Sequence, residues 1–387
     1  MISTEQKSSE LQEKKLLIHA IRYALYQGHS FSLWKTPTKN EKFLAISTSG
    51  VRQINEISLE DSETGFIFSP FLPDAKKIFF PADILYRFED GRLIEGPASD
   101  NFDSTSGTID LSHLHYLALE RNIETPDFKN LVESGIAQIE AGVLEKIVPS
   151  RYKDISLSGK FDLLRVFDLL CEKHPNALIS MVSSPATGTW MGATPELLVS
   201  TVQNKFKTVA LAGTLPYSPE INLKSVAWTQ KEIEEQALVC RYIINCFKKI
   251  RLREYEEHGP KTIVAGNLMH LKTDYEVDML ATNFPQLGSV MLKLLHPTSA
   301  VCGMPLENSL AFLKTHEGYN RQFYSGYLGP VNVKKESLIY VNLRCMQLFP
   351  DRVRLYAGAG VTADSVAETE WNETEMKMLT LQKIIAH

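Results

Sequence analysis

Two pairs of glutamates have the spacing that would let them act together on a metal ion. Glu370 and Glu373 are three residues apart, and Glu232 and Glu235 repeat that spacing. On a helix, residues three apart share a face, and Lys377 lies one turn beyond Glu373. Such a pair is most often a solvated helix face. Two pairs raise the alternative that carboxylates from two helices converge on a divalent cation.

The cysteines and histidines do not repeat any pattern of zinc ligands. The five cysteines are scattered, with no C-x-x-C pair: Cys171, Cys240, Cys246, Cys302 and Cys345. An odd number of dispersed thiols is typical of a reduced intracellular protein and not of a disulfide framework. Because the available ligands are all oxygens, the expected metal is Mg²⁺, which takes one or two carboxylates plus substrate oxygens and waters.

A glycine-rich turn precedes the second acid pair. Residues 358–363, GAGVTA, match the G-x-G-x-x-A form of a dinucleotide-binding loop. That motif needs a βαβ unit with an acidic residue at the end of its second strand. Too few residues follow Gly360 for a second parallel strand, so a nicotinamide oxidoreductase is excluded. The turn either accepts an anion on its backbone N–H groups or is a close-packed strand end.

The acid pairs fall in segments with the apolar spacing of helices. One helix is predicted from about 225 to 256, and a C-terminal helix begins at about 366. Residues 248–258, KKIRLREYEEH, are interpreted as the solvated end of the first of these helices. Its apolar side consists of Ile233, Leu238, Val239, Tyr242, Ile243, Phe247 and Ile250.

Two further helices are predicted. Thr125, Pro126 and Asp127 are interpreted as an N-cap, a first helical residue and a first-turn acid, and the helix that they begin ends near Gly142. Another helix is predicted from 161 to 174. The apolar positions of the helix after Asp127 are Phe128, Leu131, Val132, Ile136, Ile139 and Val143.

Short apolar runs between Pro, Gly and Ser clusters predict strands. The runs are FSLWK, FLAIST, GFIFSPF, KKIFF, KIVPSRYKDISL, ALISMVSS, TWMGAT, PELLVSTV and FKTVALAGT. SLIYVNLRCMQLF and VRLYAGAG, joined at Pro350 and Asp351, have the pattern of a hairpin. There is no strict βαβ alternation, so we predict an α+β fold. Large, mainly antiparallel sheets would form a layered core with helices outside.

Composition and charge argue against two classes of partner, nucleic acids and membranes. The chain has 387 residues, 44% of them hydrophobic, and a net charge of −5, which argues against nucleic acid as the main partner. The N-terminus lacks the apolar region of a signal peptide, and no run reaches the ~18–20 apolar residues of a membrane span. We therefore expect a cytoplasmic protein without a membrane partner. Residues 99–108, SDNFDSTSGT, are the most loop-like stretch.

Eight motifs, in order and spacing, carry a resemblance to a known family. They are KIVPSR (146–151), GATPELL (192–198), LAGT (211–214), LMHLKT (268–273), LHPTSAVCGMP (295–305), EGYNRQFYSGYLG (317–329), VNLR (341–344) and LYAGAG (355–360). Together they resemble the chorismate-utilising enzymes: the isochorismate, salicylate, anthranilate and aminodeoxychorismate synthases. The match covers about residues 126–382. Residues 126–387 are therefore expected to form the chorismate-binding catalytic region, and 1–125 a β-rich part of the same domain.

The resemblance implies a ligand set for Mg²⁺. Glu235 and Glu373 match the family's metal ligands, with Glu232 and Glu370 behind them through water. Chorismate is a dianion, and the ion would bind its ring carboxylate and neutralise charge. Glu232 is a departure, because many relatives have the shorter Asp at this position.

The resemblance also implies a substrate pocket. The residues that match it are Gly213, Thr214, His270, Ala300, Tyr324, Arg344, Gly360 and Lys377. Tyr324, Arg344 and the Gly360 N–H match the site of the enolpyruvyl carboxylate, where a guanidinium gives planar two-point binding. Gly213 and Thr214 would line the leaving-group side, and Lys377 would lie under the ring. His270 matches a histidine that faces the ring near C4, although a lone histidine between apolar residues is more often a core group.

Lys146 and Glu196 match the residues that exchange a hydroxyl group across the ring. In relatives that use water, this lysine deprotonates the water that attacks C2, and the glutamate protonates the departing C4 hydroxyl. A free lysine, with a pKa of about 10.4, is a poor base at neutral pH, so its environment must lower that pKa. The acid needs a raised pKa. Outside this context, Lys146 would be interpreted as a surface lysine at a strand end.

These residues favour an Mg²⁺-dependent isochorismate synthase of menaquinone or siderophore biosynthesis. Salicylate synthases tend to carry threonine at the position of Ala300, and ammonia-using anthranilate or aminodeoxychorismate synthases typically lack the lysine at 146. No glutaminase subunit is therefore expected, and the protein is expected to be a monomer or weak homodimer. A non-catalytic metal-binding module is the remaining alternative. Pro149 replaces the usual aliphatic residue of the lysine motif, which is expected to alter local strand pairing.

Overall fold

The computed structural model describes residues 4–97, 108–117, 127–157 and 161–385. The predicted loop at 99–108 lies outside these residues except for its last position, and Thr125 and Pro126 also lie outside them. None of the helices in the described ranges is long and apolar enough to cross a membrane.

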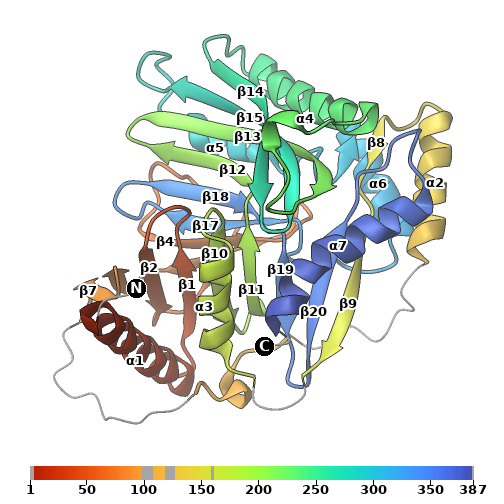
Figure 1. Cartoon of the computed structure of the whole chain (residues 1–387). Helices are drawn as coiled ribbons and strands as arrows, with labels where there is room; N and C mark the ends of the chain where they lie inside the picture. The colour runs from red at the N-terminus through yellow and green to blue at the C-terminus, as the bar shows by residue number, and fades with distance from the viewer. Residues whose placement is uncertain (1–3, 98–107, 118–126, 158–160, 386–387) are drawn as a thin grey trace.

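Two nine-stranded antiparallel sheets form the centre of the described structure (Figure 1). In order, the first contains β7 (Arg92–Glu95), β6 (Ile84–Glu89), β2 (Glu41–Ser47), β1 (Ser30–Lys35), β10 (Leu178–Ser184), β11 (Gly188–Thr194), β19 (Cys345–Leu348), β20 (Arg352–Gly358) and β9 (Ser150–Ser156). The second contains β14 (Glu256–Ala265), β15 (Leu268–Asp278), β13 (Lys205–Pro216), β12 (Leu197–Val202), β18 (Ser337–Val341), β17 (Tyr327–Val331), β4 (Gly65–Ser69), β5 (Lys77–Pro81) and β3 (Arg52–Ile54). A two-stranded sheet joins β8 (Lys146–Ile147) to β16 (Gly303–Met304).

Helices cover the outer faces of the two sheets. The described helices are α1 (Thr4–Tyr26), α2 (Phe128–Glu140), α3 (Leu163–Lys173), α4 (Gln230–Lys249), α5 (Leu287–Leu295), α6 (Leu306–His316) and α7 (Ala367–Ile385), with short 3-10 turns at Leu111–His113 and Leu223–Ser225. α1 and α3 contact the first sheet, and α4 and α5 contact the second (Figure 1). α7 lies along β20 and against α2. The predicted α+β fold with layered antiparallel sheets is confirmed.

Side chains alternate between two cores along each strand, as the pleat requires. In β1, Phe31 and Leu33 pack beneath α1 and α3, whereas Trp34 faces the second sheet. The layer between the sheets is rich in aromatic rings; Trp34 stacks on Phe43 with ring centroids 5.2 Å apart. A third core lies between the second sheet and α4 and α5. Close-packed cores on both faces make the sheets rigid supports for the loops at their ends.

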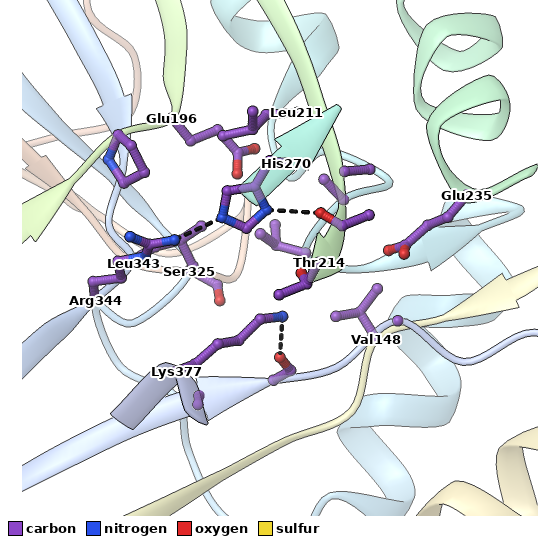
Figure 2. A pocket seen from close by; sticks show the side chains of 18 of the residues that line it. Val148, Glu196, Leu211, Thr214, Glu235, His270, Ser325, Leu343, Arg344 and Lys377 are labelled. Carbon is purple, nitrogen blue, oxygen red and sulfur yellow. Dashed lines mark hydrogen bonds between the residues drawn. The ribbon is translucent and has the colours of Figure 1, made fainter. Parts of the chain in front are cut away.

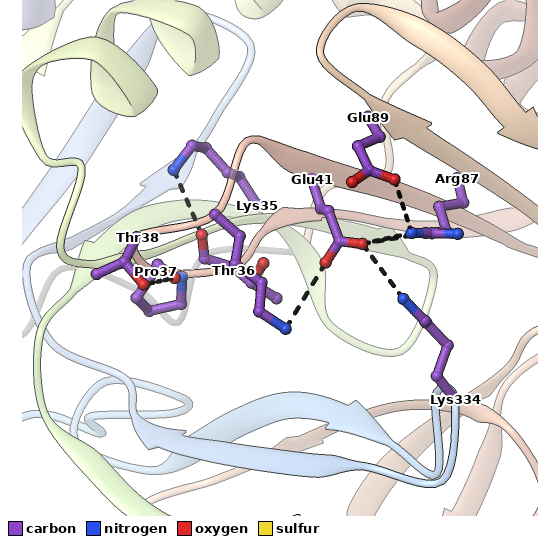
Figure 3. Close-up of polar contacts among 9 residues, drawn as sticks. Lys35, Thr36, Pro37, Thr38, Glu41, Arg87, Glu89 and Lys334 are labelled. Atoms are coloured by element: carbon purple, nitrogen blue, oxygen red, sulfur yellow. Dashed lines mark hydrogen bonds and ion pairs between the residues drawn. The ribbon is translucent and has the colours of Figure 1, made fainter.

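A charged cluster ties the first sheet to the turn between β17 and β18 (Figure 3). Glu41 on β2 is buried, and its Oε1 accepts hydrogen bonds from Arg87 Nη2 at 2.7 Å and from Lys334 Nζ at 3.3 Å. Arg87 also bonds Glu89 at 2.9 Å. Strands from before and after residue 125 therefore share both the sheets and this cluster.

Most predicted elements are confirmed, among them α3, the strands from β10 to β13 and the C-terminal helix. The predicted hairpin is correct only for β19 and β20, because β18 belongs to the second sheet and the chain crosses between sheets at 342–344. The helix after 125 begins at Phe128, capped by Asp127, whose side chain accepts from the Lys129 N–H. KIVPSRYKDISL is interrupted at Val148 and Pro149, which separate β8 from β9.

The helix predicted at 225–256 is wrong at both ends. It begins only at Gln230, because Thr229 and Glu232 form a reciprocal capping box. It stops at Lys249, and Arg251 adopts a φ of 57°, which a helix cannot continue. Residues 256–265 form β14, so 248–258 is not one solvated helix end, and Ile233 is 47% exposed.

Helix α1 was not predicted, because only its second half carries an apolar pattern. Leu16, Leu17 and Ile21 are buried against the first sheet. The residues before them are mainly polar. Tertiary packing of one short apolar face therefore stabilises this helix.

We predict that Glu41→Ala lowers the free energy of unfolding by about 1–3 kcal/mol, because it leaves the mostly buried Arg87 without its main acceptor. The measurement is urea unfolding followed by tryptophan fluorescence. Glu89→Ala is the matched control; it removes an exposed partner of the same guanidinium and is expected to change stability by less than about 0.5 kcal/mol. Equal effects of the two substitutions would contradict the role given to Glu41.

Candidate active site

A polar cavity lies where the ends of both sheets meet α4 and α7 (Figure 2). Of the residues predicted from the sequence, those that line it are Glu196, Gly213, Thr214, Glu235, His270, Ala300, Tyr324, Arg344, Gly360 and Lys377. They come from separate elements: β13 supplies Gly213 and Thr214, β15 supplies His270, and α4 and α7 supply Glu235 and Lys377. The fold therefore gathers in one place residues that are widely separated in the sequence.

Lys146 lies behind this cavity and is completely buried, with 0% exposure. Its Nζ donates a hydrogen bond to Glu235 Oε1 at 2.8 Å. Gly360 makes this approach possible, because a Cβ on Gly360 would lie 2.3 Å from Glu235 Oε1 and 3.2 Å from Lys146 Cε. Outside the family context, the sequence indicated a surface lysine at this position, and that interpretation is wrong. A buried ammonium requires a carboxylate partner, and α4 provides it.

Glu196 has a different environment from Glu235, although both carboxylates line the cavity. Burial raises the pKa of Glu196 to about 7, while the positive charges of Lys146 and Lys377 oppose the rise. The pKa of Glu235 moves the other way, to about 2, because Lys146 and other lysines outweigh its burial. Two carboxyl groups with pKa values driven apart are the usual basis for separate acid and charge-bearing roles.

His270 connects the two sides of the cavity. Its Nδ1 lies 2.7 Å from the Gly213 carbonyl oxygen, and Arg344 Nη2 lies 2.7 Å from its Nε2. A carbonyl only accepts and a guanidinium only donates, so Nδ1 carries the proton and Nε2 accepts. Burial and the Arg344 charge lower the pKa of His270 to about 3, which keeps the ring neutral. His270 is thus a hydrogen-bonded member of the cavity wall.

Arg344 is held from two directions. Besides its contact with His270, its Nη1 donates to the Ala265 carbonyl at 2.6 Å. The residue has a φ of 46° at the crossing between the two sheets, and burial lowers its pKa to about 10. At that pKa the guanidinium remains charged at neutral pH, so it offers a fixed positive group to an anion in the cavity.

Three of the four glutamates predicted as metal ligands are paired with lysines. Glu235 pairs with Lys146, as described above. Lys231 Nζ lies 2.6 Å from Glu370 Oε1, and Lys377 Nζ lies 2.7 Å from Glu373 Oε1. Lys377 also donates to the Gly358 carbonyl at 2.8 Å.

Glu232, the fourth predicted ligand, packs beside Gly213 of the cavity wall and has no lysine partner among the described ion pairs. It is occupied at the cap of α4, where it accepts from the Thr229 N–H at 3.1 Å.

The carboxylate oxygens of Glu235, Glu370 and Glu373 are the type of ligand that a hard cation prefers. Glu370 is completely buried, and its Oε2 has no hydrogen-bond partner among the described residues. Lys231 contacts Glu370, and the charges of Glu373 and Glu235 also act on its ammonium group. Within the described ranges, no three acidic, histidine or cysteine side chains are arranged so that they could hold a metal ion. An ion would therefore have to replace the lysines as the counter-charge of the glutamates.

Sequence reasoning missed Lys231. This lysine stands directly before Glu232, and its partner Glu370 lies on the other helix with an acid pair. A lysine one turn before Glu235 was the available signal, but spacing along one helix does not show which face of another helix it meets.

Relatives of known name match two thirds of the chain or more. The isochorismate synthase EntC of Escherichia coli is 26% identical over 266 residues, which are 67% of each chain. The isochorismate synthase DhbC of Bacillus subtilis is 30% identical over 270 residues, again 67% of each chain. The anthranilate synthase component 1 of Saccharolobus solfataricus is 23% identical over 79% of this chain and 73% of its own.

Solved structures support the fold over nearly the whole chain. The menaquinone-specific isochorismate synthase MenF of Escherichia coli has a TM-score of 0.72 at 19% identity, covering 95% of this chain and 91% of its own. Anthranilate synthase component I of Streptococcus pneumoniae has a TM-score of 0.64 at 17% identity, covering 91% and 89%. At these identities the likeness concerns the fold alone.

A family model described as chorismate binding enzyme matches residues 99–386, which is more than half of the chain. This match confirms the resemblance inferred from the eight sequence motifs, and its span contains every residue of the cavity described above. The chain therefore belongs to the chorismate binding enzyme family.

Proposed function

We propose that this protein is an isochorismate synthase, which converts chorismate to isochorismate. The observation that carries the proposal is that one cavity has a buried carboxyl group, Glu196, in its wall and a buried amine, Lys146, directly behind it. Lys146 is held by Glu235, and Glu196 has a pKa raised to about 7. Relatives named isochorismate synthase at 26% and 30% identity support the same reaction.

The proposed reaction is balanced without an oxidant or a second substrate other than water. Lys146 takes a proton from the water whose oxygen forms a bond to C2 of the ring. Glu196 gives a proton to the C4 hydroxyl, which leaves as water when its C–O bond breaks. The ring double bonds shift between these positions, and one water enters as another departs. Proton return from Lys146 to Glu196 through solvent restores the enzyme.

Arg344 and Tyr324 form the proposed site for the enolpyruvyl carboxylate, together with the Gly360 N–H. Tyr324 stacks on Tyr356 with ring centroids 5.2 Å apart, and burial raises the pKa of its hydroxyl above the usual range. The hydroxyl therefore stays a neutral donor. A charged guanidinium and a neutral phenol, both fixed by packing, orient an anion with little loss of side-chain freedom.

We further propose that Glu235 and Glu373 bind Mg²⁺, with Glu370 supporting them. Bound there, the ion would neutralise a substrate carboxylate and fix its position. Besides its pair with Lys231, buried Glu370 has one oxygen, Oε2, without a hydrogen-bond partner among the described residues, and this oxygen is available to a bound ion or its water. A carboxylate engaged with a metal no longer holds the Lys146 ammonium, which would free this amine to face the attacking water.

Two features favour this reaction over its closest alternatives. Ala300 lines the cavity where salicylate synthases tend to carry threonine, so isochorismate is proposed as the released product. The buried lysine at 146 favours water over ammonia as the nucleophile. A relative named for vibriobactin and another named for menaquinone both match, so we propose that the isochorismate feeds one of these two kinds of pathway.

Purified protein incubated with chorismate and Mg²⁺ is expected to yield isochorismate, both with and without ammonium. Chromatography of the products tests this directly. Salicylate plus pyruvate, or an aminated ring that appears only with ammonium, would replace the proposed reaction by that of a sister enzyme. A chain that binds Mg²⁺ but leaves chorismate intact would instead be a non-catalytic module.

Lys146→Ala is expected to lower kcat by at least about 100-fold, the usual size of a general base contribution, while chorismate still binds in the presence of Mg²⁺. Isothermal titration measures the binding and a coupled assay the turnover. Lys153→Ala is the control, because Lys153 also pairs with a glutamate, Glu375 at 3.0 Å, but Glu375, unlike Glu235, does not line the cavity. Full activity of the Lys146 variant would remove the proposed base.

The turnover of the wild-type enzyme is expected to fall as the pH rises above about 7. A general acid works only when protonated, and the raised pKa of Glu196 places the loss of its proton near pH 7. Glu196→Gln cannot give up a proton, so its residual rate, about 10²–10⁴-fold lower, is expected to lack this falling limb. Rate profiles from pH 5.5 to 9 on both proteins distinguish the cases; an unchanged limb in the variant would assign it to another group.

A further inference from the structure

Glu317 and Arg321 form an ion pair that lies behind the cavity and does not line it. Both residues are only 3% exposed. Arg321 Nε donates to Glu317 Oε2 and Arg321 Nη2 to Glu317 Oε1, each at 2.6 Å. Removing two charges from water costs free energy. The attraction within the pair offsets this desolvation only when the remaining donors and acceptors also form hydrogen bonds.

Arg321 also donates hydrogen bonds to the backbone of the cavity wall. Its Nη2 donates to the Val148 carbonyl at 2.7 Å, and its Nη1 donates to the Val301 carbonyl at 2.8 Å. Val148 and Val301 both line the cavity. Val148 lies two residues after Lys146, and Val301 directly follows Ala300. One guanidinium therefore fixes the spacing between two cavity walls.

Glu317 holds the same segment from its other side. Its Oε1 accepts hydrogen bonds from the Ser150 N–H and the Ser150 hydroxyl, each at 2.7 Å. The Ser150 hydroxyl also contacts the Tyr319 hydroxyl at 2.5 Å. Between Val148 and Ser150 lies Pro149, which has no N–H to donate. The ion pair thus holds the two polar groups that flank the proline, immediately beyond the strand that carries Lys146.

We propose that Glu317 and Arg321 are positioning residues for the reaction: through Val148 and Ser150 they set where Lys146 stands relative to the opposite wall at Ala300. The inference rests on the proposed role of Lys146 as the base. Neither residue lines the cavity, and their hydrogen bonds reach its wall through the backbone of Val148 and Val301. A displacement of a catalytic group by about 1 Å costs roughly 100-fold in rate, so this clamp affects turnover far more than substrate affinity.

Arg321→Lys tests the proposal, because lysine keeps the charge but lacks the planar fork that reaches Glu317 and two carbonyls together. The variant is expected to lose about 10- to 100-fold in kcat, with KM for chorismate changed less than about threefold. Amide exchange of the peptides covering Val148 to Ser150 is expected to speed up at least about tenfold, measured by mass spectrometry without substrate.

Arg354→Lys is the matched control. Arg354 also makes a two-point pair, with Asp154 at 2.7 and 2.8 Å, and its guanidinium lies 3.7 Å from the centroid of an aromatic ring, that of Tyr152. Its two hydrogen bonds to Asp154 reach no residue of the cavity wall. Its kcat and the amide exchange around Val148 are expected to stay at wild-type values, although its thermal stability falls.

Three outcomes decide the matter. A kcat loss confined to Arg321→Lys, with faster exchange around Val148, supports the positioning role; equal kcat in both variants, or a rise in KM as large as the fall in kcat, overturns it.

If Arg321→Lys does not fold, Ser150→Ala replaces it, with the same pattern expected at a smaller size. Inactivity of the wild type would refute the proposed function, while the exchange measurement would still decide whether the pair fixes this segment.

Discussion

The ion pair of Lys146 with Glu235 is the contact on which the rest of the site depends. A completely buried ammonium is stable only beside a carboxylate, and that carboxylate comes from a helix far away in the sequence. The approach of α4 to β8 requires Gly360 between them, where a Cβ would collide with Glu235. The strand end, the long helix and the glycine turn are therefore mutually dependent, and a change in any one of them would move the proposed base and the proposed metal ligand together.

Charge balance explains how such a site can exist both without and with its ligands. Without them, Lys146, Lys231 and Lys377 each pair with a glutamate, so the charges of Glu235, Glu370 and Glu373 are each compensated. Chorismate is a dianion and Mg²⁺ a dication, so together they add no net charge. Either one alone would leave a buried imbalance, which is costly in a poorly solvated site. We therefore expect the affinities for ion and substrate to be coupled.

Local patterns in the sequence were sufficient for much of the fold, because α3 and the strands from β10 to β13 have regular periodicity and clear turn residues. Ordered motifs were sufficient to collect most of the predicted cavity residues, because the family resemblance assigned them to one site. Contacts between distant elements were not predictable. Nothing in the order of residues shows that Lys231 meets Glu370, or that half of α1 packs on a sheet. The ends of α4 were misplaced because apolar spacing continues past the true cap at Thr229.

Pro149 links the local strand pattern to the position of Lys146. As a residue without an N–H, it cannot continue the ladder, and the strand that bears Lys146 ends at Ile147 while β9 begins only at Ser150. The gap would leave the Val148 carbonyl and the Ser150 N–H without strand partners in a buried place. Arg321 and Glu317 satisfy both groups, and the Pro149 carbonyl accepts from the Ala359 N–H at 3.2 Å on the other side. β8 and β9 belong to different sheets, and the short segment between them is fixed by these side chains. Lys146 can then be placed against the cavity independently of the sheet that follows it.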